Sequence, residues 1–185
     1  RFIKSAMDSD YYPRLATAAA DHEAFNRLVD EQTEIGVLLA VPPLMILLTL
    51  APLIVPLAFS DEFLPAVTLI RWVALGYLGQ VIAHPLSFAL LALRRGGLFV
   101  LTEALFYLLL LAMTLAGIYG FGLDGVGVAL FAVFLPFTAL EYAILRHLTG
   151  FRWSPGSRRL LFHLLPLVTL AFLSGHWLTP WPAAG

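Results

Sequence analysis

The sequence has no cysteine and few charges. Without cysteine the chain can form neither disulfides nor thiolate metal sites. Charged residues make up 12% of the chain and hydrophobic residues 60%, whereas soluble domains carry about 25% charged residues. The five histidines show no H-x-x-x-H metal spacing, and no Ser-His-Asp grouping is recognisable. We therefore predict a polytopic membrane protein without a metal, a cofactor or enzymatic activity.

One stretch, residues 35–59, contains no charged residue at all. At about 1.5 Å rise per residue, a helix of this length crosses a hydrocarbon core of about 30 Å. Prolines inside a helix remove backbone hydrogen bonds, and in a membrane the freed carbonyls need partners from protein or water. We predict a kinked spanning helix that packs against other helices, with four internal prolines: Pro42, Pro43, Pro52 and Pro56.

Four more apolar runs follow, separated by short polar or glycine-rich breaks. The glycines at positions 120, 122, 125 and 127 do not form a nucleotide loop, because both flanks are apolar helices. They are expected to let helices approach closely. The pattern predicts an all-α transmembrane bundle of about five spans, at residues 35–59, 65–93, 98–119, 126–145 and 160–178.

The N-terminal residues 1–33 are polar and mixed in charge. Tyr12-Pro13 predicts a break, because the residue before a proline disfavours helix. Apolar residues then recur at helical spacing over residues 14–30. This pattern predicts either an amphipathic helix at the membrane surface or a helical connector between spans.

Basic residues fall on alternate connections between the predicted spans. Because cytoplasmic loops collect Lys and Arg, the side that holds most of them is predicted to be cytoplasmic. This side has ten of the eleven basic residues: Arg1, Lys4, Arg14, Arg27, Arg94, Arg95, Arg146, Arg152, Arg158 and Arg159. We predict three parts: a cytoplasmic segment at 1–33, four spans at 34–148, and a basic cytoplasmic loop with one extra span at 149–185. Trp177 and Trp181 are placed like an interfacial aromatic anchor.

Several separated motifs resemble one family, the bacterial O-antigen and exopolysaccharide flippases of the multidrug/oligosaccharidyl-lipid/polysaccharide exporter superfamily. They read DYYPRL at 10–15, NRLVDEQTEIG at 26–36, APLIVPLAFSDEF at 51–63, LIRWVALG at 69–76 and GLDGVGVA at 122–129. The sequence departs from the family pattern at Asp30, where Asn is expected.

The resemblance implies the C-terminal lobe of a two-lobe transporter, with the N-terminal lobe supplied by a longer chain. It implies alternating access in the bacterial inner membrane, with a polyprenyl-pyrophosphate-linked oligosaccharide as substrate, membrane lipids as surroundings and no nucleic-acid partner. The gating or structural positions that it marks are Tyr12, Pro13, Arg14, Glu31, Glu34, Pro42 and Pro43.

Arg71 is the basic residue that lies outside the cytoplasmic set. A charge within a span suggests function, and a guanidinium suits bidentate contacts with a substrate phosphate. The alternative is that Arg71 extends to the outer headgroups and pairs with Asp61 or Glu62. Both interpretations stay open from the sequence.

Three more titratable residues lie within the spans. His84 precedes Pro85 and either lines a polar cavity or bonds a carbonyl freed by the proline. Glu103 and Glu141 either bind a coupling cation or pair with Arg94, Arg95 or Arg146, and for Glu141 we expect the pair. The substrate-binding candidates are therefore Arg71, His84 and Glu103.

Two other functions are compatible with the sequence. A cation-coupled multidrug exporter of the same superfamily would need an acidic residue deep in a cavity, for which Glu103 is the candidate. A polytopic glycosyltransferase or acyltransferase would need a catalytic Asp or His in a loop at the membrane surface. The predicted outer loops hold only Asp61, Glu62 and Asp124, which argues against the enzyme.

Overall fold

The computed structural model describes residues 11–64 and 66–178, and all elements within them are helical. Residues 11–17 form a helical segment ahead of the first labelled element. The elements are η1 (Ala18–Ala20), α2 (His22–Ala58), η2 (Asp61–Phe63), α3 (Ala66–Ala92), α4 (Gly96–Phe121), α5 (Leu123–Thr149) and α6 (Pro155–Leu178).

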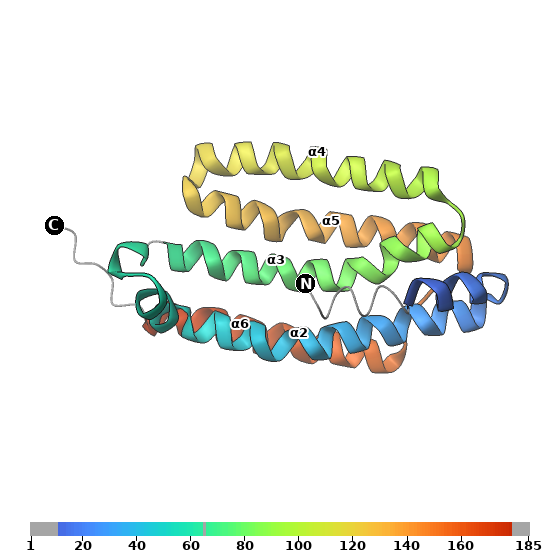
Figure 1. The fold of residues 1–185 in the computed structure, drawn as a ribbon, viewed down its shortest axis with the longest axis horizontal. Helices are drawn as coiled ribbons and strands as arrows, with labels where there is room; N and C mark the ends of the chain where they lie inside the picture. Colours follow the sequence, from blue (N-terminus) through green and yellow to red (C-terminus); the bar gives the residue numbers. More distant parts are fainter. Residues whose placement is uncertain (1–10, 65, 179–185) are drawn as a thin grey trace.

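Consecutive long helices run in opposite directions in one elongated bundle, so α3 and α5 are parallel neighbours, as are α2 and α6 (Figure 1). Helices α3, α5 and α4 follow one another across one side, while α2 and α6 lie together on the other. The segment before α2, the α3–α4 turn and the α5–α6 loop meet at one end of the bundle. The described basic residues of the predicted cytoplasmic side therefore share this end, called the basic end below. Arg1 and Lys4 lie outside the described residues.

Five helices of the described chain are long and apolar enough to cross a membrane, which confirms the predicted number of spans. The bounds of α3 to α6 lie within a few residues of the prediction. The first span differs, because α2 begins at His22 and continues through the predicted boundary between residues 33 and 34. The polar segment and the first span are thus one continuous helix.

The break near the N-terminus lies at Asp21 and not at Tyr12-Pro13. Residues 11–17 are helical, so Pro13 is accommodated within a helix, and the expected helix over 14–30 is interrupted. Asp21 is extended, and its carboxylate accepts hydrogen bonds from the backbone N–H groups of Glu23 and Ala24. This N-cap starts α2, because it satisfies donors that have no partner within the helix.

Glycines bring α5 close to both of its neighbours. A Cβ on Gly79 of α3 would lie 2.6 Å from Cβ of Phe134 in α5. Near the α4–α5 turn, a Cβ on Gly125 would lie 2.0 Å from the carbonyl oxygen of Gly117. Larger side chains would separate these helices, so the expected role of Gly125 in close helix packing is confirmed.

Helix α4 lies at the edge of the bundle, and few of its side chains are buried against the other helices. Within this fully described helix, Thr102 is the one buried residue. Its exposed side chains are large and apolar, among them Leu101, Leu105, Leu108 and Leu111. Such a surface would be costly in water and is suited to lipid or to another apolar helix.

Candidate functional site

Arg71 is buried between three helices and is only 3% exposed. From α3 its Nε donates a hydrogen bond to the carbonyl oxygen of Leu48 in α2, at 3.0 Å. Its Nη2 donates to the carbonyl oxygen of Phe172 in α6, and its Cζ lies 4.7 Å from the Phe172 ring centroid. The guanidinium thus joins α2, α3 and α6.

The acceptor in α2 is a carbonyl that a proline has freed. In a regular helix the Leu48 carbonyl accepts a hydrogen bond from the residue four positions later, which here is Pro52, and proline has no N–H. Arg71 replaces this missing donor. The headgroup contact was one of the two interpretations that the sequence left open for Arg71. The structure differs from it, because the guanidinium contacts helix backbones while Glu62 is exposed.

Glu141 is another buried charge-bearing residue within the spans, and it is 0% exposed. From α5 its Oε1 accepts a hydrogen bond of 2.6 Å from the Ser87 hydroxyl of α3. Its Oε2 is buried without a hydrogen-bond partner among the described residues. The expected pairing with an arginine is wrong, because Arg94, Arg95 and Arg146 are exposed at the basic end and Ser87 is the partner.

The other two titratable residues lie close to these helices. Glu103 of α4 is half-buried and acts electrostatically on Glu141 across the α4–α5 interface. His84 of α3 is also half-buried, and its ring lies 4.5 Å from that of Phe88. Of the three predicted substrate-binding residues, Glu103 lies on the helix facing Glu141 and His84 lies one turn before its partner Ser87, while Arg71 lies toward the other end of α3.

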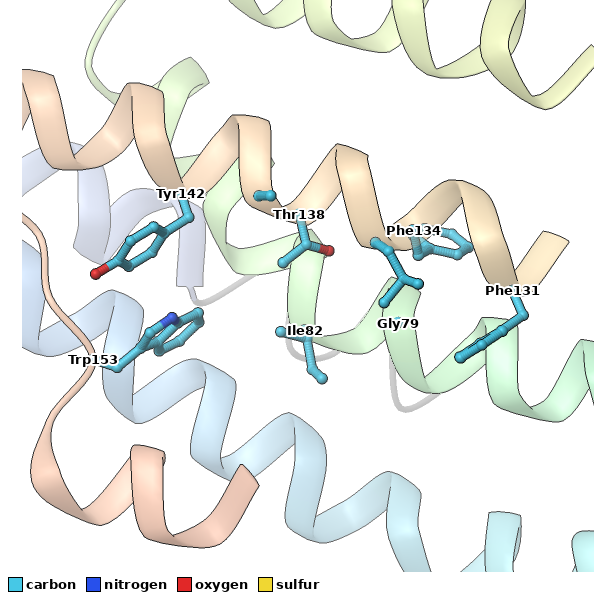
Figure 2. Close-up of a pocket in the computed structure, with 9 residues that line it drawn as sticks. Gly79, Ile82, Phe131, Phe134, Thr138, Tyr142 and Trp153 are labelled. Carbon is cyan, nitrogen blue, oxygen red and sulfur yellow. The ribbon is translucent and has the colours of Figure 1, made fainter. Parts of the chain in front are cut away.

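A cleft of about 360 Å³ opens between α3, α5 and the α5–α6 loop (Figure 2). Its aromatic wall includes Tyr142 and Trp153, whose rings are almost parallel at 7° with centroids 6.0 Å apart. Thr138 adds a hydroxyl to the otherwise apolar surface. The lining residues are Gly79, Ile82, Phe131, Phe134, Leu135, Thr138, Ala139, Tyr142 and Trp153. Arg71, His84 and Glu103 are not among them.

A polar cluster at the basic end holds α6 against α2. The Ser157 hydroxyl lies 2.7 Å from Oδ1 of Asp30 and 2.8 Å from Oε1 of Glu34. The backbone N–H of Ser154 also donates to Asp30, at 3.1 Å. Asp30 and Glu34 thus satisfy donors at the N-terminus of α6, where negative charge is favourable.

The positions that the family resemblance marks do not form one site. Glu34 belongs to the cluster at the start of α6, whereas Glu31 lies on the surface 4.0 Å from Arg27. The remaining five positions are exposed: Tyr12, Pro13, Arg14, Pro42 and Pro43. The buried neighbour Tyr11 donates a hydrogen bond to the Pro85 carbonyl at 3.2 Å, and burial raises the pKa of its phenol.

Sequence reasoning missed Ser87, Tyr142 and Trp153. Ser87 is one hydroxyl within an apolar span, and its partner is 54 residues away in the chain. Tyr142 and Trp153 on either side of the basic loop were the available sequence signal for the cleft. The sequence does not show that their rings face each other, because ring orientation is set by packing. These three residues supply most of the polar groups near the cleft and Glu141.

Comparison with known proteins assigns no family. No family model matches the chain, and neither a curated protein nor a solved structure is similar to it. The resemblance to polysaccharide flippases therefore stays a prediction.

Proposed function

We propose that this chain is one lobe of a membrane transporter that flips a polyprenyl-pyrophosphate-linked oligosaccharide across the bacterial inner membrane. The observation that carries the proposal is the aromatic cleft within a five-span bundle. Ligand sites are typically clefts of about 300–1,000 Å³ with apolar, aromatic walls and a few polar groups. The cleft has this character, because Tyr142, Trp153 and Thr138 combine apolar surface with hydrogen-bonding tips.

This mixture of surfaces supports the proposed substrate class. A lipid-linked saccharide has an apolar chain, an anionic pyrophosphate and flat faces of sugar rings that suit aromatic walls. The cleft lies on α5 and the α5–α6 loop, which leads to the basic end. Exposed arginines there, including Arg146 and Arg152, suit the anionic part of the carrier. The cleft accommodates part of such a molecule, so the proposal includes a second lobe that completes the cavity.

A cation-coupled exporter of lipophilic drugs is the second candidate. It is favoured by Glu141, a buried carboxylic residue close to the cleft-bearing helix pair. An apolar cleft also accepts a flat drug molecule. The two functions differ in the ligand that the cleft prefers.

Binding to the full chain in lipid nanodiscs separates them. We expect a polyprenyl-pyrophosphate-linked saccharide to bind, and Trp153→Ala to weaken binding about tenfold or more, which is about 1.4 kcal/mol or more for an aromatic side chain at the centre of a contact. Tyr107→Ala is the matched control, because Tyr107 is an exposed aromatic residue of α4 outside the cleft. Tighter binding of a lipophilic cation, with no saccharide-lipid binding, would replace the proposal with the exporter.

A further inference from the structure

Glu141 lacks the surroundings that an ionised carboxylate requires. Its side chain is 0% exposed, one oxygen has Ser87 as its partner, and the other has no partner among the described residues. Burying an ionised carboxylate costs far more than burying a neutral acid. A hydrogen bond from a single hydroxyl does not compensate for this cost. The buried carboxylate therefore needs a positively charged ligand that neutralises it.

The helices packed around Glu141 place few titratable or charged groups near it. Helix α3 contributes Ser87 and, one turn earlier, the half-buried His84, whose ring lies 4.5 Å from that of Phe88 at a tilt of 58°. Helix α4 contributes Glu103, which is half-buried and is an acid rather than a cation. On α5 itself the nearest cation in sequence is Arg146, which is exposed.

We propose that Glu141 is a proton-binding site, protonated while α3, α4 and α5 are packed as in this structure. A proton neutralises the carboxyl without needing further ligands, whereas a metal cation takes several oxygen ligands. No group of three or more His, Asp or Glu residues in the described chain could hold a metal ion. The proton is therefore the ligand that this site fits.

The hydrogen-bond geometry accommodates the added proton. The Ser87 hydroxyl lies 2.6 Å from Oε1 of Glu141 and 3.4 Å from the carbonyl oxygen of Ala83. A hydroxyl has one hydrogen and can also accept. With Glu141 protonated, the carboxylic acid donates to Ser87 and Ser87 donates to Ala83. In the ionised form Ser87 would donate to Glu141, and the bond to Ala83 would be lost.

Release of the proton requires the helices to separate. Helix α4 is the cover that we expect to move, because Thr102 is its one buried residue and it contacts the remaining helices mainly through α5. When water reaches the carboxyl, the ionised form is solvated and the proton leaves. The site thus links protonation to the packing of α4, and this link does not depend on what the cleft binds.

Infrared spectroscopy of the full chain in phosphatidylethanolamine–phosphatidylglycerol vesicles tests the proposal. At neutral pH we expect a carboxylic-acid C=O band in the wild type, which Glu141→Gln removes completely. Glu62→Gln is the matched control and leaves the band in place, because Glu62 is exposed at the opposite end of the bundle. The readout involves no saccharide, so its outcome is independent of the flippase proposal.

Ser87→Ala provides a second measurement if the Gln variant fails to insert. Loss of the hydroxyl is expected to shift the C=O band to higher frequency, because a hydrogen-bond partner of the acid has gone. Absence of the band in the wild type, or a band unaffected by both variants, would overturn the proposal. Loss of the wild-type band on adding Na⁺ at constant pH would also overturn it, in favour of a sodium site.

Discussion

Arg71 and Glu141 are both buried in membrane-spanning helices, yet their surroundings differ. Arg71 lies five residues after the start of α3, near the end that carries η2, and donates to carbonyls of two neighbouring helices. Glu141 lies eight residues before the end of α5, toward the basic end, with one hydrogen bond and one orphan oxygen. The guanidinium of Arg71 thus donates to backbone carbonyls of two other helices, whereas the carboxyl of Glu141 has one side-chain partner.

The difference has a simple cause in the chemistry of helices. A backbone carbonyl has two lone pairs, so it can accept a second hydrogen bond after its helical one. A backbone N–H has one hydrogen, which the helix already uses. Packed helices can therefore surround a cation with acceptors, especially where Pro52 frees a carbonyl, but they have no donors left for an anion. This asymmetry keeps Arg71 charged and favours a proton on Glu141.

The largest expected effect comes from removing the cation. Arg71→Leu leaves the Leu48 carbonyl, which Pro52 has freed, without a donor, and it removes the additional hydrogen bond and the ring contact that tie α3 to Phe172 of α6. We expect a loss of about 2–4 kcal/mol in the free energy of unfolding, since leaving buried hydrogen-bonding groups unpaired costs about 1–3 kcal/mol each. Reversible unfolding in mixed micelles, followed by circular dichroism, measures it. The unfolding free energy of Arg71→Lys is expected to lie between those of the wild type and Arg71→Leu, because lysine keeps the charge but lacks the planar guanidinium. Unchanged stability of the Leu variant would remove the distinction between the two sites.

A second mutation tests the origin of the freed carbonyl. Pro52→Ala supplies an N–H to Leu48, so in the Arg71→Leu background it is expected to recover about 1 kcal/mol, the usual net value of one hydrogen bond. A double-mutant cycle of unfolding free energies isolates this coupling. Pro42→Ala is the control, because Pro42 is exposed on α2 and its freed carbonyl is not that of Leu48. Equal recovery by both alanines would show that Arg71 does not compensate for Pro52 in particular.

Removing the acid is expected to cost much less than removing the cation. Glu141→Leu replaces a neutral acid by an apolar side chain of similar size, and Ser87 keeps the Ala83 carbonyl as its acceptor. We expect a change within about 1 kcal/mol, because well-packed apolar replacements of buried polar groups are often neutral or stabilising. The same unfolding assay measures it beside Arg71→Leu. A loss as large as that of the arginine variant would mean that Glu141 is ionised and held by a strong partner.

The smallest effect on stability is expected from exposed cysteines that define the two ends. Arg95→Cys and Glu62→Cys lie at opposite ends of the bundle and should change stability within about 0.5 kcal/mol. An impermeant thiol reagent should label position 62 from outside intact cells and position 95 only after the inner face is opened. The native chain has no cysteine to interfere. Labelling of position 95 from outside would reverse the proposed orientation and place Arg71 nearer the cytoplasm.

The sequence by itself determined the number of spans and their approximate ends. Apolar length is a local property, so residues 98–119 were sufficient to predict α4, and the alternation of basic residues predicted which connections share an end. It also identified the charges inside the spans. It missed the continuity of α2 from His22, because the polar residues before position 34 resembled a separate segment.

Only the tertiary structure decided what these charges contact. Phe172 lies 101 residues from Arg71 in the chain, and Ser87 lies 54 residues from Glu141. The cleft likewise requires Trp153 to fold back toward α3 and α5. The physical reason is that lipid is as apolar as a protein core, so hydrophobicity does not distinguish the face of a helix that meets lipid from the face that meets protein. Close packing at glycines such as Gly79 and Gly125 makes that choice, and it depends on all the helices at once.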